Sequence, residues 1–170
     1  MLRMSLTTCR SLTVVLSVMI PSTHVAAQTG TMKEQIVGTW AYVSVDTVRP
    51  DGARQPMYGA NPQGLAVFDA GGHYILMTSR ADIAKFASGN RTEGTPEENK
   101  AVVHGMIAHF GTYSVNEAEK TVTFHVTTSS FPNWNGVEQK RPFSVDGDQL
   151  KWATPASSGG TAEVVLRRLR

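Results

Sequence analysis

Arg141 and Gln139 are the residues whose types and spacing best suit binding chemistry. Alternate residues of a strand share a face, so these two share one with the apolar Val137, Phe143 and Val145. If that face is buried, Arg141 is a desolvated cation that requires a partner. Either it orients a carboxylate, carbonyl or phenol of a ligand together with Gln139, or it pairs with an internal acidic residue or reaches solvent at the mouth of the fold.

His125 is the candidate acid-base group. It lies on the strand face opposite to Val122, Phe124 and Val126. If those three face an outer helix, His125 points inward near Arg141, where an imidazole can hydrogen-bond or transfer protons near neutral pH. Alternatively its face is solvated, since alternation alone does not say which face is the inner one.

Two aromatic residues complete the candidate site. Tyr113 can place its hydroxyl in a cavity and Trp134 can cover the mouth, although both also suit core packing or loop closure. Core packing is the expected role of Trp40 and Trp152. The expected ligand-binding set is therefore Tyr113, His125, Trp134, Gln139 and Arg141.

The sequence contains no recognised catalytic or metal-binding motif. His104 and His109 lie five residues apart, which does not match the helical same-face spacing of three or four. There is no His-Glu-x-x-His pair, phosphate-binding glycine loop or Gly-x-Ser-x-Gly turn. We expect no metal and no cofactor.

The first 27 residues have the three parts of a secretory signal. Arg3 and Arg10 form a positive region, an apolar run follows from Leu12 to Ile20, and Val-Ala-Ala at 25–27 predicts a cut after Ala27. The alternative is a retained anchor, but the run is shorter than the roughly 20 residues that span a bilayer. We therefore expect a secreted or periplasmic protein with no stable membrane anchor after cleavage.

Removal of this segment changes the charge and the cysteine content of residues 28–170. The formal charge of +2 comes from 16 basic and 14 acidic residues, and two basic residues leave with the signal. A formally neutral chain offers no electrostatic case for binding nucleic acid. The single cysteine, Cys9, also leaves, which excludes disulfides and thiol catalysis in one domain of about 143 residues.

The candidate residues lie in a series of short, alternating segments separated by turns, which is typical of an antiparallel β-sandwich or barrel. We expect about eight strands, at residues 38–48, 64–68, 73–78, 110–115, 122–127, 137–145, 150–154 and 162–170. Eight strands can close into a barrel that is filled by side chains or holds one small ligand.

One main helix interrupts the strands, and we expect it around residues 96–107. Thr95 and Glu98 form a capping box around Pro96. Apolar residues then recur at roughly helical spacing up to Phe110, with Gly105 or Gly111 expected to end the helix. A shorter helical piece is expected at 79–87.

Five stretches of the chain resemble the bacterial and fungal lipocalin-like domain family: IVGTWAYVSV, YGANPQGLAVFDAGGHY, FASGNRTEGTPEENKAVVHGMIAHFGTYSV, VTFHVTTSSFPNWNGVEQKRPF and GDQLKWATP. The most specific are the Phe-Gly-Thr-Tyr run at 110–113 and the block from His125 to Arg141. The resemblance implies a calycin-type up-and-down barrel, in a group that includes ligand carriers and some isomerases or cyclases. The chain departs from the commoner pattern at Phe124, where many relatives have a second His, so the resemblance supports no role for paired imidazoles.

Three functions follow as hypotheses. The first is an exported protein that binds a small, mostly apolar molecule in its barrel. The second is an isomerase or cyclase that acts on a small hydrophobic metabolite, with His125, Arg141 and Tyr113 converging on one space. The third is a structural domain with a filled barrel. The contents of the barrel interior distinguish the three.

Overall fold

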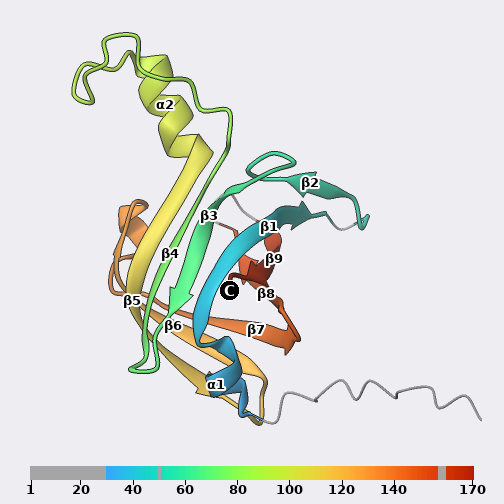
Figure 1. Cartoon of the computed structure of the whole chain (residues 1–170). Helices are drawn as coiled ribbons and strands as arrows, with labels where there is room; N and C mark the ends of the chain where they lie inside the picture. The colour runs from blue at the N-terminus through green and yellow to red at the C-terminus, as the bar shows by residue number, and fades with distance from the viewer. Residues whose placement is uncertain (1–29, 50, 157–159) are drawn as a thin grey trace, which may run out of the picture.

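The strands form one antiparallel sheet that closes on itself (Figure 1). The computed structural model of the chain describes residues 30–49, 51–156 and 160–170, so the predicted signal peptide and its cleavage site lie outside the described residues. The helices and strands are α1 (Met32–Ile36), β1 (Gly38–Val48), β2 (Arg54–Pro56), β3 (Gln63–Phe68), β4 (His73–Ser79), α2 (Pro96–Gly105), β5 (Met106–Asn116), β6 (Thr121–Ser129), the 3-10 helix η1 (Pro132–Trp134), β7 (Glu138–Asp146), β8 (Gln149–Pro155) and β9 (Thr161–Arg168).

The long strand β1 closes the barrel. Its first residues, 38–41, pair with β3, and residues 40–48 pair with β9 at the other end of the strand order. Closure leaves the barrel strands without a free edge. Among the described residues β2 is an extra three-residue strand on the end of β1, so the predicted barrel of about eight strands is confirmed by β1 and β3–β9.

Residues alternate between the interior and the outer face along most strands. On β4, Tyr74 and Leu76 are buried while Ile75 is exposed. On β6, Val122 and Phe124 are fully buried, so this face of β6 is the inner one. The rings of Phe68, Tyr74, Phe124 and Trp152 contact one another in the middle of the core, with centroids 4.7–6.4 Å apart.

A β-bulge in β1 interrupts this alternation. Tyr42 pairs with Leu166 and Ser44 pairs with the adjacent Val165, so Val43 is the extra residue and is 47% exposed. The bulge places Tyr42 on the same inner side as Val45, although strict alternation assigns them to opposite faces.

Helix α2 begins as predicted and ends at Gly105. The Thr95–Glu98 capping box is formed, with Pro96 in the first turn. A Cβ at residue 105 would lie 2.9 Å from the end of the Ile83 side chain, so Ile83 packs closely against the end of the helix. The helix continues the line of β5 beyond the end of the barrel (Figure 1).

Two local predictions near this helix are wrong. Met106 and Phe110 belong to β5, so their helical spacing was coincidental; β5 is held by pairing with β4 and β6, which overrides the local pattern. Residues 80–87 form a turn at 81–82 followed by irregular backbone at 83–86, rather than the expected short helix. The backbone of this segment is held by contacts with α2: the Arg80 N–H donates to the Gly105 carbonyl at 2.8 Å, and the Ala87 N–H donates to Glu98 Oε1 at 2.7 Å.

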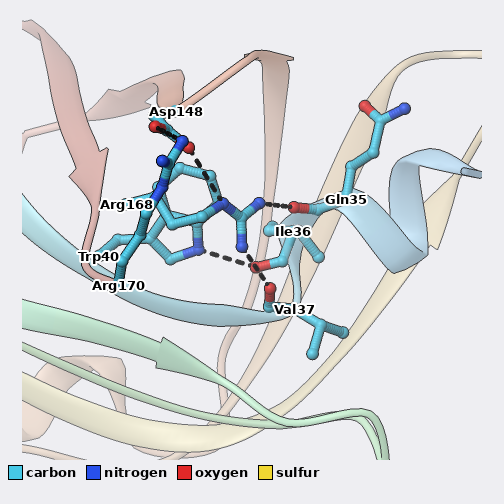
Figure 2. A network of polar contacts seen from close by, with 7 residues as sticks. All are labelled: Gln35, Ile36, Val37, Trp40, Asp148, Arg168 and Arg170. Atoms are coloured by element: carbon cyan, nitrogen blue, oxygen red, sulfur yellow. Dashed lines mark hydrogen bonds and ion pairs between the residues drawn. The ribbon is translucent and has the colours of Figure 1, made fainter. Parts of the chain in front are cut away.

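A polar clamp closes the end of the barrel where α1 meets β1 (Figure 2). The Trp40 Nε1 donates to the Ile36 carbonyl at 2.8 Å. The Arg168 guanidinium lies 4.0 Å from the Trp40 ring and donates to the carbonyls of Val37 and Gln35 at 2.8 and 2.6 Å. This clamp joins both ends of the described chain, and an opening to the interior lies at the opposite end.

Candidate functional site

The barrel interior contains a cavity of about 50 Å³ near the end opposite to the Trp40 clamp. Most of its apolar walls come from β1, β4, β8 and β9. The apolar lining residues are Val45, Met57, Leu76, Ile107, Pro155, Ala156, Ala162 and Val164. The polar and aromatic lining residues are Tyr42, Tyr58, Thr78, His109, Trp134, Arg141, Trp152 and Thr154.

The mouth of this pocket is formed by partly exposed residues. Ile107 lies at the start of β5, Trp134 lies in η1, Pro155 is the last residue of β8, and Ala156 follows it. The Trp134 ring packs edge-on against the His109 ring, with centroids 5.6 Å apart. The mouth therefore has a mostly apolar rim, and the polar groups of the pocket lie deeper.

Arg141 is the cation of this pocket and is only 3% exposed. Its Nη2 donates to Gln139 Oε1 at 2.5 Å, and its guanidinium carbon lies 4.5 Å from the Phe124 ring centroid and 5.8 Å from that of Trp152. In the described ranges no Asp or Glu forms an ion pair with it. Burial lowers the pKa of Arg141 to about 10, so it carries its charge at neutral pH.

Three buried polar atoms lack a hydrogen-bond partner among the described residues, and all three belong to side chains of this pocket. They are Thr78 Oγ1, Arg141 Nε and Trp152 Nε1. Buried polar groups are almost always hydrogen-bonded, because an unpaired one costs about 1–3 kcal/mol. Their occurrence around one cavity marks the cavity as a place where a further group can bind.

The other titratable groups around Arg141 are neutral at neutral pH. Burial, with the charge of Arg141, lowers the pKa of His109 to about 3, and the His109 Nδ1 shares a 2.9 Å hydrogen bond with the Tyr74 hydroxyl. Burial raises the pKa of Tyr42, Tyr58 and Tyr74. The pocket therefore has one positive charge among phenols, an imidazole and aromatic rings.

The structure brings together three of the five residues that the sequence suggested. Arg141 and Trp134 line the pocket, and Gln139 contacts Arg141 from the same strand face. Tyr113 is buried elsewhere: its hydroxyl donates to the Asp69 carbonyl at 2.7 Å, and its ring packs edge-on against that of Phe68.

His125 lies on the outer face of the barrel. Its Nδ1 is 2.9 Å from Glu138 Oε1, and both side chains are substantially exposed. His125 therefore lies on the solvated face of β6, as the alternative hypothesis states. The opposite face of β6, which carries Val122 and Phe124, is the buried one. His125, Tyr113 and Arg141 do not converge on one space, as the isomerase or cyclase hypothesis requires.

Sequence reasoning missed six polar or aromatic residues of the pocket: Tyr42, Tyr58, Thr78, His109, Trp152 and Thr154. Thr78 shares its strand face with Tyr74 and Leu76, so period-two alternation could have found it. The separation of His104 and His109 is compared above with the spacing of a helix, but His109 lies on strand β5. Tyr42 is turned inward by the bulge at Val43, for which the sequence has no clear signal.

The structure offers neither a metal cluster nor a spanning helix in the residues that it describes. Those residues hold no group of three or more His, Cys, Asp or Glu side chains with metal-binding geometry. None of the described helices combines the length and hydropathy needed to cross a bilayer.

Comparison with known proteins assigns the fold to a family. No curated protein matches the chain. Among solved structures, a lipocalin-like protein from Bacteroides uniformis ATCC 8492 is 11% identical, with a TM-score of 0.44 over 79% of this chain and 99% of that one. A de novo designed fluorescence-activating β-barrel is 14% identical, with a TM-score of 0.44 over 82% and 99%. The redesigned barrel mFAP1, solved bound to DFHBI, is 16% identical, with a TM-score of 0.39 over 82% and 100%.

The family itself is shown by a match to the sequence of the chain. A family model described as a lipocalin-like domain matches residues 37–167. That range contains all eight barrel strands that the structure describes, apart from Arg168 at the end of β9. The chain belongs to the lipocalin-like domain family.

Proposed function

We propose that this protein is an exported carrier or sensor that binds a small, mostly apolar molecule in its barrel. The observation that supports this is the pocket at the open end, which combines apolar walls with three polar side chains that each have a buried atom without a partner among the described residues. Small-molecule sites have this composition. A purely structural barrel has no need of unpaired buried donors, because apolar side chains would fill the same space at lower cost.

The size of the cavity limits how a ligand binds. Ligand sites commonly enclose about 300–1,000 Å³, whereas this cavity is about 50 Å³. A ligand therefore places one group in the cavity and its remaining atoms between the rim residues, chiefly Ile107, Trp134 and Pro155. Binding requires these rim side chains to move outward, and their partial exposure makes such movement inexpensive.

Binding is tested with a matched pair of variants on β9. Val164 is 4% exposed and lines the pocket, whereas the adjacent Val165 points to the outer face. N-phenyl-1-naphthylamine, a neutral dye that fluoresces in apolar sites, serves as the probe. We expect the wild-type protein and Val165→Phe to bind it alike, and Val164→Phe to bind it at least 10-fold more weakly.

Circular dichroism and thermal melting show whether both variants are folded. No enhancement of dye fluorescence with the wild-type protein, or equal binding by folded Val164→Phe, contradicts a ligand site in this barrel.

Export is the second part of the proposal, supported by Arg3 and Arg10, the apolar run and the small residues before Gln28. Expression of the full chain in a Gram-negative host should yield periplasmic protein whose N-terminal residue is Gln28. Recovery from the cytoplasm with residues 1–27 attached contradicts it.

A further inference from the structure

We propose that the ligand is a monocarboxylate with an apolar body, whose carboxylate enters the cavity and pairs with Arg141. This inference rests on the proposed function and specifies the chemical class of its ligand. It follows from the charge, the hydrogen-bonding character and the size of the cavity.

The charge of Arg141 has no negative counterpart in the described part of the chain. The cavity lining includes no Asp or Glu, and the single hydrogen-bond partner of the guanidinium in the described residues is the neutral amide of Gln139. The Phe124 and Trp152 rings stabilise the cation through their faces but do not neutralise it. A buried cation is costly unless it is paired, and a bound anion supplies the missing partner.

The unpaired groups around the cavity select a hydrogen-bond acceptor. Arg141 Nε and Trp152 Nε1 can only donate, and the Thr78 hydroxyl can donate as well. A cationic ligand is repelled by Arg141, and a ligand without acceptors leaves both donors unpaired. Arg and carboxylate match in geometry, because the planar guanidinium can donate two parallel hydrogen bonds to the two carboxylate oxygens.

The dimensions of the pocket place the carboxylate inside and the apolar body at the mouth. A cavity of about 50 Å³ has room for a few water-sized groups. A carboxylate is of that size, and a single guanidinium balances its single negative charge. The apolar rim that includes Ile107 and Trp134 then covers the body of the ligand.

The inference is tested by displacement of N-phenyl-1-naphthylamine from the wild-type protein. The competitors are 4-phenylbutyrate, its neutral amide 4-phenylbutyramide, and acetate, which has the carboxylate without the apolar body. We expect 4-phenylbutyrate to compete at least 10-fold more strongly than the amide and at least 10-fold more strongly than acetate.

Variants then assign the preference to Arg141. Arg141→Met should lower the affinity for 4-phenylbutyrate to that for the amide, with the dye affinity of this variant measured first so that each competitor's affinity is calculated from it. Arg141→Lys retains the charge and should retain a preference for the acid. Arg167→Met, which removes an exposed cation from the outer face of β9, is the matched control and should leave the preference unchanged.

Each failure has a distinct meaning. Equal displacement by acid and amide in the wild-type protein overturns the inference and leaves the proposed binding function intact, since the dye still binds. If acetate displaces the dye as well as 4-phenylbutyrate does, the proposal that the ligand has an apolar body is wrong. Retention of the full acid preference by folded Arg141→Met overturns the role of Arg141, and the comparison in the wild-type protein is decisive even if that variant does not fold.

Discussion

Burial changes the chemistry of individual side chains in this barrel. His109 and Arg141 are both positively ionisable, and both have a lowered pKa because each is desolvated. The consequence differs between the two groups. At neutral pH the His109 imidazole has lost its proton and is neutral, whereas the Arg141 guanidinium keeps its proton and its charge. Arg141 is therefore the cation that a ligand encounters, and His109 is a neutral hydrogen-bonding partner of Tyr74.

The lowered pKa of His109 predicts a pH dependence of stability. The folded pKa of about 3 is below the ordinary value of 6.5, so protons bind the unfolded chain preferentially as the pH falls. The stability that depends on neutral His109 is complete above pH 6.5 and is lost below it, by about 2 kcal/mol between pH 6.5 and 5. Urea unfolding of wild type and His109→Gln at both pH values measures this difference in slope.

His104→Gln is the control for that experiment, because His104 lies on the exposed side of α2. The carboxylates with lowered pKa values, such as Asp82 and Glu98, protonate below this pH window and do not contribute within it. If the free energy of unfolding falls by the same amount between the two pH values in wild type and in His109→Gln, the burial of a neutral imidazole at residue 109 is contradicted.

Tyr113 offers a second prediction at the scale of one residue. Tyr113→Phe removes the hydroxyl that donates to the Asp69 carbonyl at 2.7 Å. We expect a loss of about 1 kcal/mol in the free energy of unfolding, which is the usual net value of one hydrogen bond. Dye binding should be unchanged, because Tyr113 does not line the pocket. Weakened dye binding at unchanged stability would place Tyr113 in the site after all.

At the scale of the elements, close contacts between strands determine where glycine is required. Gly111 on β5 lies at the irregularity in the pairing with β6. A Cβ added there would lie 2.0 Å from the His125 carbonyl oxygen, far inside the contact distance of carbon and oxygen. The two strands approach so closely only because residue 111 has no side chain.

Gly111→Ala is therefore expected to destabilise the barrel strongly, by on the order of 3 kcal/mol or more, because a backbone atom rather than a side chain must move. Gly136→Ala is the control: its φ is +75°, but no atom lies within 4 Å of the added Cβ, so a loss of about 1 kcal/mol is expected. Chemical unfolding of both variants measures the difference. Equal losses would mean that the close approach of β5 and β6 does not exist in solution.

At the scale of the whole molecule, the clamp between Arg168 and Trp40 ties the last strand to the first (Figure 2). Arg168 donates hydrogen bonds to two carbonyls at the α1–β1 junction, those of Val37 and Gln35. The clamp therefore lies beside the pairing of β1 with β9, which closes the barrel.

Arg168→Met should lower the free energy of unfolding by about 2–4 kcal/mol, because it removes two hydrogen bonds from the guanidinium and the cation from the Trp40 ring. Arg170→Met is the matched control, since Arg170 is largely exposed and is held only by its contact with Asp148. That control should change stability by less than about 0.5 kcal/mol. Similar melting temperatures for Arg168→Met and wild type contradict the role of the clamp.

The sequence by itself determined the features that depend on local pattern. The period-two alternation predicted the strands and placed Gln139, Arg141 and Phe143 together on one face of β7. The Thr95–Glu98 capping box predicted the start of α2, because capping involves only residues within one turn. The number and spacing of such strands predicted a β-sandwich or a barrel of about eight strands, and the resemblance to the lipocalin-like family implied the barrel.

The tertiary structure alone decided what depends on partners far apart in the chain. The buried face of β6 is decided by the packing of Phe124 against Tyr74 and Trp152, which come from other strands. Because that face is buried, His125 on the opposite face points outward. Whether Arg141 meets an acidic partner depends on every strand around the barrel. Alternation specifies two faces of a strand, but only the closed sheet makes one of them the interior and surrounds Arg141 with neutral groups.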